Sequence, residues 1–149
     1  MRKNAKRKNR TAFTMVELVA VLIILGLLAA AVVRSFTGQV DRARVGTTKT
    51  SLKNLHNAVL QFKLDTTRYP EESEEEGLNA LIEEPTDVTG WQPGGYLETT
   101  EVPKDAWGNE FIYQLDPESG KPFVVISYGA DGEPEGEDYD ADLYSTDAN

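Results

Sequence analysis

The stretch that decides the fold is FTMVELVAVLIILGLLAAAVV, residues 13–33, in which Glu17 is the single charged residue. A helix rises about 1.5 Å per residue, so these 21 residues span roughly 30 Å, the thickness of a bilayer core. The sequence therefore predicts an apolar helix that can cross a membrane once. Glu17 needs an explanation, because a charged side chain there costs on the order of 3 kcal/mol even on the mildest scales.

Charge is divided unevenly between the start of the chain and the rest. Residues 1–12 contain six Lys and Arg and no acid, although the 149-residue chain has a formal net charge of −10. Residues 13–149 therefore hold nine basic and 25 acidic residues, a net charge of −16. The positive-inside rule keeps a basic head cytoplasmic, which predicts a periplasmic body. The acidic body argues against a nucleic-acid partner, because phosphate binding needs clustered Lys and Arg.

Beyond residue 33 the spacing of apolar residues predicts that the helix continues to about Asp65. Gly38 and Gly46 weaken the prediction of an unbroken helix. We expect the single histidine, His56, to lie on the surface of this helix between polar positions.

The remaining body has the pattern of a small mixed domain. Residues 77–85 predict a short second helix ended by Pro85, and residues 71–76 are a charge run expected to be a solvated face. The tail from residue 129 on is expected to be loop. The composition predicts two strands, at residues 110–115 and 122–128, joined by a hairpin turn at residues 116–120.

Three kinds of protein contain a segment like residues 13–33. A cleaved secretory signal has a shorter apolar core of roughly 7–15 residues. A permanent anchor fits the length but gives no reason for Glu17. The third interpretation is a segment through which subunits assemble, and it depends on the motifs that surround Glu17.

The order of features at the N-terminus resembles the class III signal of type IV pilins and pseudopilins: a basic leader, then FTMVEL, then the apolar run. The resemblance implies that a peptidase cuts between Ala12 and Phe13 and that Phe13 is then N-methylated. Glu17 becomes the fifth residue of the mature chain. Ala12 stands where the family usually has glycine.

Six further motifs occur in the order found in the major pseudopilin of type II secretion systems, the G subunit, which the chain resembles over nearly its whole length. They are DTTRYP (65–70), EGLNAL (76–81), GYL (95–97), PKDAWG (103–108), SYGADG (127–132) and DADL (140–143).

This resemblance implies a type IV pilin-like α+β fold: a long N-terminal, partly transmembrane α-helix packed on a small antiparallel β-sheet, with a calcium-binding C-terminal loop. The expected organisation is a cleaved leader, an apolar transmembrane and assembly helix, an amphipathic continuation of the helix, and a periplasmic globular domain. The corresponding ranges are residues 1–12, 13–33, 34–65 and 66–149.

The implied function is that of a structural subunit of the type II secretion pseudopilus, which polymerises through its N-terminal helix to drive protein export across the outer membrane. Its implied partners are other copies of itself, minor pseudopilins, a prepilin peptidase, an inner-membrane assembly platform with its ATPase, and a secretin. The subunit would be a single-pass inner-membrane protein with a periplasmic body, and a periplasmic filament after assembly.

Two alternatives stay open. The first is a type IV pilin or competence pseudopilin, although many long-filament pilins carry a C-terminal disulfide and this chain has no cysteine. The second is a membrane-anchored periplasmic calcium-binding module that does not polymerise, in which Glu17 would be dispensable. We expect no enzyme, because the sequence has no phosphate-binding glycine loop, no GxSxG serine and no His–carboxylate arrangement.

Glu17 has a specific expected partner. Cleavage before Phe13 would create a free amine, and staggered helices in a filament bring Glu17 of one copy near Phe13 of a neighbour. Each charge alone is costly in an apolar core, so the pair sets register more than it adds stability.

The acidic tail is the candidate metal site. Four aspartates lie within twelve residues, among glycines, and Ca²⁺ takes six to eight oxygens from carboxylates and backbone carbonyls. The alternative is a solvated acidic tail. The resemblance favours Asp131, Asp140 and Asp142 as ligands with the Tyr128 carbonyl, and leaves Asp138 as the fourth candidate because the family often has glycine there.

Overall fold

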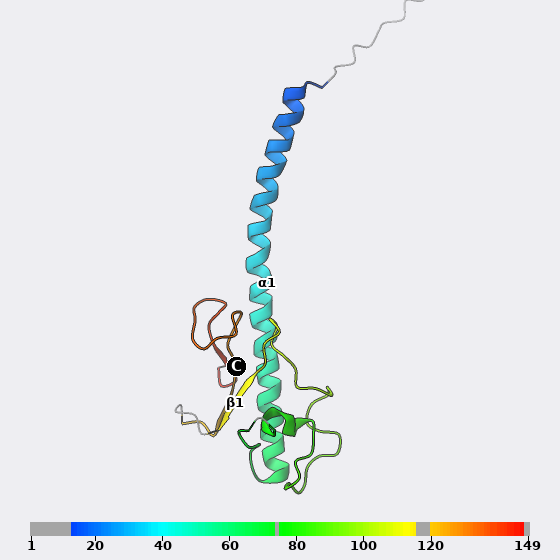
Figure 1. Cartoon of the computed structure of the whole chain (residues 1–149), viewed down its shortest axis with the longest axis vertical. Helices are drawn as coiled ribbons and strands as arrows, with labels where there is room; N and C mark the ends of the chain where they lie inside the picture. Colours follow the sequence, from blue (N-terminus) through cyan, green and yellow to red (C-terminus); the bar gives the residue numbers. More distant parts are fainter. Residues whose placement is uncertain (1–12, 74, 116–119, 148–149) are drawn as a thin grey trace, which may run out of the picture. The chain divides into compact units, whose positions relative to one another are not determined.

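The computed structural model describes residues 13–73, 75–115 and 120–147. The leader at residues 1–12 and most of the expected hairpin turn at 116–120 lie outside these ranges. The elements in chain order are helix α1 (Met15–Thr66), the 3-10 helix η1 (Gly77–Leu81), and strands β1 (Ile112–Leu115), β2 (Phe123–Ser127) and β3 (Leu143–Tyr144) (Figure 1). The chain forms two compact units, Met1–Gln39 and Val40–Asn149.

Helix α1 is continuous over 52 residues. It passes through Gly38 and Gly46 without a break, although both glycines weakened the prediction of an unbroken helix. A glycine in a helix interior destabilises the helix by only about 1 kcal/mol relative to alanine. The helix ends at Thr66, one residue beyond the expected position. Thr67 has a left-handed φ of 68°, and its N–H donates to the Lys63 carbonyl over 3.0 Å, which closes the last turn.

The three strands form an antiparallel sheet in the order β1-β2-β3. Tyr113 on β1 pairs with Val125 on β2, and Ile126 on β2 pairs with Tyr144 on β3. Both predicted strands are confirmed. The prediction that the tail is entirely loop is wrong, because the tail contributes β3, which is too short for a hydrophobic pattern to indicate.

The core of the second unit lies between α1 and the sheet (Figure 1). Buried side chains recur every three or four residues on α1, which places them on one helical face. Phe123 and Val125 alternate along β2 and meet this face, whereas Val124 and Ile126 are buried on the opposite side of the strand. The predicted α+β architecture, a long helix packed on a small antiparallel sheet, is confirmed. The contributing helix residues are Leu52, Leu55, Ala58, Val59 and Phe62.

The predicted helix at 77–85 is only a five-residue 3-10 helix. Immediately before it, Glu76 forms an ion pair with Arg68, whose Nη1 lies 2.6 Å from Oε1, and accepts the Glu71 N–H over 2.8 Å. The interpretation of residues 71–76 as a solvated face is therefore wrong for Glu76, which ties this segment to the end of α1. It holds for Glu71, which is exposed.

His56 is half-buried, so its expected place on the surface is wrong. Its ring stacks on Phe123 at a centroid distance of 4.6 Å, and Nδ1 lies 3.2 Å from Ser145 Oγ. Burial lowers the pKa of the His56 imidazole. Ser145 follows β3, the strand that the sequence did not indicate, which is why the covering of His56 could not be foreseen.

Candidate functional site

The N-terminal end of α1 is capped by Thr14. The Glu17 N–H donates to Thr14 Oγ1 over 3.2 Å, and the Leu18 N–H donates to the Thr14 carbonyl over 3.2 Å. Thr14 and Glu17 thus occupy the N-cap and N3 positions of a capping-box sequence, in which an acid is also favoured by the helix dipole. Thr14 is therefore the helix cap, and Glu17 is an acid in the first turn; the sequence reasoning missed this, although Thr-x-x-Glu was visible as a motif. Ala12 lies outside the described residues.

The first part of α1 is an apolar surface open to its surroundings. Every residue from 13 to 30 is exposed, including Phe13 at 79%, Met15 at 89% and Leu27 at 68%. Keeping a large apolar side chain in water forgoes about 1.5–3 kcal/mol of burial free energy. In the isolated chain this surface is thus uncovered. Within the part of the chain that the structure describes, no helix combines the length and apolar character of a membrane span.

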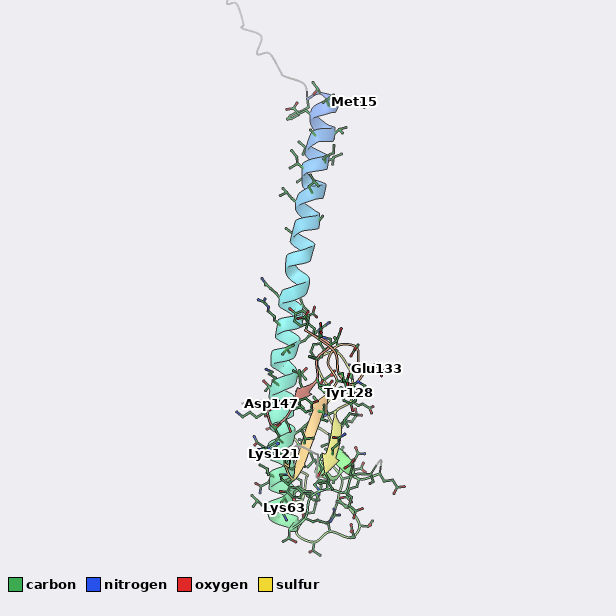
Figure 2. The ribbon with its side chains drawn as sticks, turned by 90° about the vertical axis from the view of Figure 1, so that its left-hand side faces the viewer. Met15, Lys63, Lys121, Tyr128, Glu133 and Asp147 are labelled. Atoms are coloured by element: carbon green, nitrogen blue, oxygen red, sulfur yellow. The ribbon has the colours of Figure 1, made fainter. Side chains whose placement is uncertain are left out.

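The acidic loop, residues 129–142, connects β2 to β3. Tyr128 marks its beginning at one end of β2, and Lys121 precedes the opposite end of the strand (Figure 2). The loop folds back on itself: the Ala130 N–H donates to the Tyr139 carbonyl over 2.9 Å. Gly129 and Gly136 have positive φ angles of 72° and 109°.

These two glycines are required by close backbone approaches. A Cβ on Gly129 would lie 2.7 Å from the Asp140 carbonyl carbon, and a Cβ on Gly136 would lie 2.5 Å from the Asp140 carbonyl oxygen. Contacts below 3.0 Å with backbone atoms cannot be relieved by a rotamer change, so only glycine fits at either position. The backbone around Asp140 is therefore enclosed by the loop.

The predicted ligands are brought into one loop but not into one cluster. Asp131, Asp138 and Asp140 are exposed, whereas Asp142 and Tyr128 are half-buried. Among residues 13–73, 75–115 and 120–147, no group of three or more acidic or histidine side chains is arranged to hold a metal ion.

Among the predicted ligands, Asp142 is the one with a buried side-chain oxygen that has no hydrogen-bond partner. Its Oδ2 accepts the Glu135 N–H over 3.2 Å and the Tyr144 hydroxyl over 3.1 Å. Its Oδ1 is buried and has no hydrogen-bond partner. Burial, and then the hydrogen bond to Asp142, raise the pKa of the Tyr144 hydroxyl. A buried carboxylate oxygen without a partner costs about 1–3 kcal/mol or more, and a cation would satisfy it.

Two residues beside the loop were missed by the sequence reasoning. Asn109 Nδ2 donates to the Gly129 carbonyl over 2.8 Å, and the Asp105 carboxylate accepts the Asn109 N–H over 2.8 Å. The pattern Asp-x-x-Gly, residues 105–108, is typical of a turn held by an aspartate side chain and could have indicated Asp105. Nothing local to the sequence indicates that Asn109 reaches Gly129, twenty residues away.

Comparison with known proteins gives consistent results for both parts of the chain. Residues 35–146 match the family described as type II secretion system (T2SS), protein G, and residues 7–33 match the prokaryotic N-terminal methylation motif. The chain is 39% identical over 141 residues to the type II secretion system core protein G of Pseudomonas aeruginosa, a match that covers 93% of this chain and 96% of that protein. The corresponding protein of Vibrio cholerae is 36% identical over 140 residues, which cover 93% of this chain and 92% of that protein.

A solved structure is similar as well. It is the crystal structure of the major pseudopilin from the type 2 secretion system of enterohaemorrhagic Escherichia coli, with a TM-score of 0.59 and 28% sequence identity. The match covers 72% of this chain and 90% of that chain.

Proposed function

Because the chain belongs to the type II secretion system protein G family and is thus a structural subunit of the pseudopilus, we propose that it polymerises through residues 13–33 and thereby drives protein export across the outer membrane. The observation that carries the proposal is the uncovered apolar surface of residues 13–30, with one carboxylate on it. Two surroundings can cover such a surface: a bilayer before assembly and other copies of the helix afterwards. Gly26 and Ala29–Ala31 are small residues of the kind that allow helices to approach closely.

Glu17 supports polymerisation over permanent anchoring. The cap at the helix start uses the Glu17 backbone N–H, and a glutamine is equally accepted at the N3 position of a capping box, so capping does not require a charge at residue 17. A charge in an apolar core requires an opposite charge, and the amine of a cleaved Phe13 on a neighbouring copy supplies one. This pairing would select the axial position at which a new copy joins.

The N-terminal methylation motif supports processing of the leader. A prepilin peptidase would cut between Ala12 and Phe13 and methylate the new terminus. The small side chain of Ala12 suits a pocket that accepts glycine. Cleavage is also the step that creates the amine for Glu17, so assembly would depend on it.

Membership of the family, together with the methylation motif, implies a membrane-anchored protein with a periplasmic body. We expect the anchor to be a single inner-membrane span within residues 13–33. Membership of the family implies that the subunit assembles with other copies of itself and works with the type II secretion machinery. The specific ones that we propose are minor pseudopilins, the assembly platform with its ATPase, and the secretin.

We also propose that the acidic loop binds Ca²⁺. Support comes from the partnerless buried Oδ1 of Asp142, the curled glycine-containing backbone, and the oxygen-rich composition of the loop. Asp142 would hold the ion with Asp131, Asp140 and the Tyr128 carbonyl, and Asp138 is the additional candidate. The cation would neutralise mutually repelling carboxylates and hold together a small, cysteine-free domain.

The role of the Glu17 charge is tested by the substitution Glu17→Gln, which keeps the backbone N–H that Thr14 caps and removes the charge. We expect at least about a tenfold loss of subunit incorporation into filaments and of protein export, because one charge of a buried pair is removed. The matched control is Thr14→Ala, which weakens the cap but keeps the charge, and which should assemble. Undiminished incorporation of Glu17→Gln would contradict the proposed mechanism.

Processing is tested by the intact mass of the protein purified from its native membrane. The expected species lacks residues 1–12 and carries one additional methyl group. A subunit that keeps these residues while assembled would show that the Phe13 amine is not the partner of Glu17.

Calcium binding is tested by thermal unfolding of the full chain in detergent, in excess calcium and in excess chelator. Calcium at a hundredfold over its dissociation constant should stabilise the body by about 2.7 kcal/mol and raise Tm on the order of 10 °C. Asp142→Asn should abolish the difference, whereas Asp147→Asn, an exposed aspartate outside the predicted ligand set, should retain it. Equal Tm values with calcium and with chelator would refute a structural calcium ion.

A further inference from the structure

The Asp105 carboxylate is buried, with only 6% of the residue exposed, and neither filament assembly nor metal binding as described above uses it. Its Oδ1 accepts two backbone N–H groups, from Trp107 over 3.0 Å and from Asn109 over 2.8 Å. Its Oδ2 accepts the Ser127 hydroxyl over 2.7 Å. A carboxylate with three donors is a rigid centre, because moving any donor leaves a buried charge less well satisfied.

Asn109 extends this centre to the acidic loop. In addition to the hydrogen bond from Nδ2 to the Gly129 carbonyl, the Asn109 side chain lies against Gly132, where an added Cβ would be 3.2 Å from Asn109 Cγ. Gly129 and Gly132 flank Asp131, and Gly129 directly follows Tyr128. Asn109 is thus hydrogen-bonded to the residue that follows Tyr128 and lies beside the residue that follows Asp131.

The same centre is attached to the rest of the second unit. Ser127, at the end of β2, accepts the Gly129 N–H over 3.3 Å while it donates to Asp105. The Ala106 N–H donates over 3.1 Å to Thr48 Oγ1, a fully buried side chain on α1. The first turn of the acidic loop is therefore connected through hydrogen bonds to the sheet and to the helix.

We propose that Asp105 and Asn109 are positioning residues that hold residues 128–132 in the conformation that binds Ca²⁺. This inference rests on the proposed calcium binding. The backbone of residues 128–132, which carries the Tyr128 carbonyl and Asp131, is then held in place before the ion arrives, so less conformational freedom is lost on binding. Groups that orient metal ligands in this way typically change metal affinity by about 10–100-fold when they are removed.

The test compares calcium binding and stability of the full chain in detergent. Asn109→Ala should raise the calcium dissociation constant, measured by isothermal titration calorimetry, by about tenfold or more. In excess chelator its Tm should remain within a few degrees of the parent value, because one hydrogen bond is lost. Ser127→Ala, which removes one donor from Asp105, should weaken calcium binding in the same direction. Asn54→Ala, at an exposed position on α1, is the matched control and should leave both quantities unchanged.

The outcomes separate the inference from the proposed function. If the parent binds calcium and Asn109→Ala binds it with the same affinity, the positioning role is overturned and calcium binding stands. The same conclusion holds if the variant loses equal stability with calcium and with chelator, because the residue is then only structural. If the parent shows no calcium binding, the proposed metal site fails and the inference fails with it.

Discussion

The exposed apolar surface of residues 13–30, with the Glu17 carboxylate on it, is the constraint on which the function depends. A helix face of this kind is unfavourable in water, so it must be covered by lipid or by other proteins. Lipid can cover the apolar side chains but gives the carboxylate no partner. Neighbouring copies would do both if the proposed cleavage before Phe13 produces a terminal amine. Membership of the pseudopilin family and the local chemistry of the segment therefore lead to the same mechanism.

The second unit has a different stability problem. It is small and has no cysteine, and in the part of it that the structure describes the sheet consists of three short strands, the third of only two residues. Its core is built mainly from one face of α1 packed on β2. The long loops between the helix and the strands are therefore held by polar interactions. The ion pair of Arg68 with Glu76 and the buried Asp105 carboxylate serve this purpose. A cation bound in the acidic loop would be a third polar interaction that stabilises a long connection without burying additional apolar area.

The sequence predicted the features that depend on local patterns. Helical spacing through Leu55 and Phe62 predicted α1, and the composition around Val125 predicted β2, because both signals repeat over several residues. The sequence did not predict the features that depend on tertiary contacts. The two-residue strand β3 has no pattern of its own, and without β3 the burial of His56 could not be foreseen. The ligand candidates were identified from composition and resemblance, whereas Asn109 became visible only through its contact with Gly129.

The account is tested most directly by a cryo-electron microscopy reconstruction of filaments assembled from this chain. It predicts that each subunit begins at Phe13, that residues 13–30 are buried among neighbouring helices, and that the Glu17 carboxylate lies within about 4 Å of the Phe13 nitrogen of another copy. A filament in which the Glu17 carboxylate faces water or apolar side chains, with that amine elsewhere, would contradict the account.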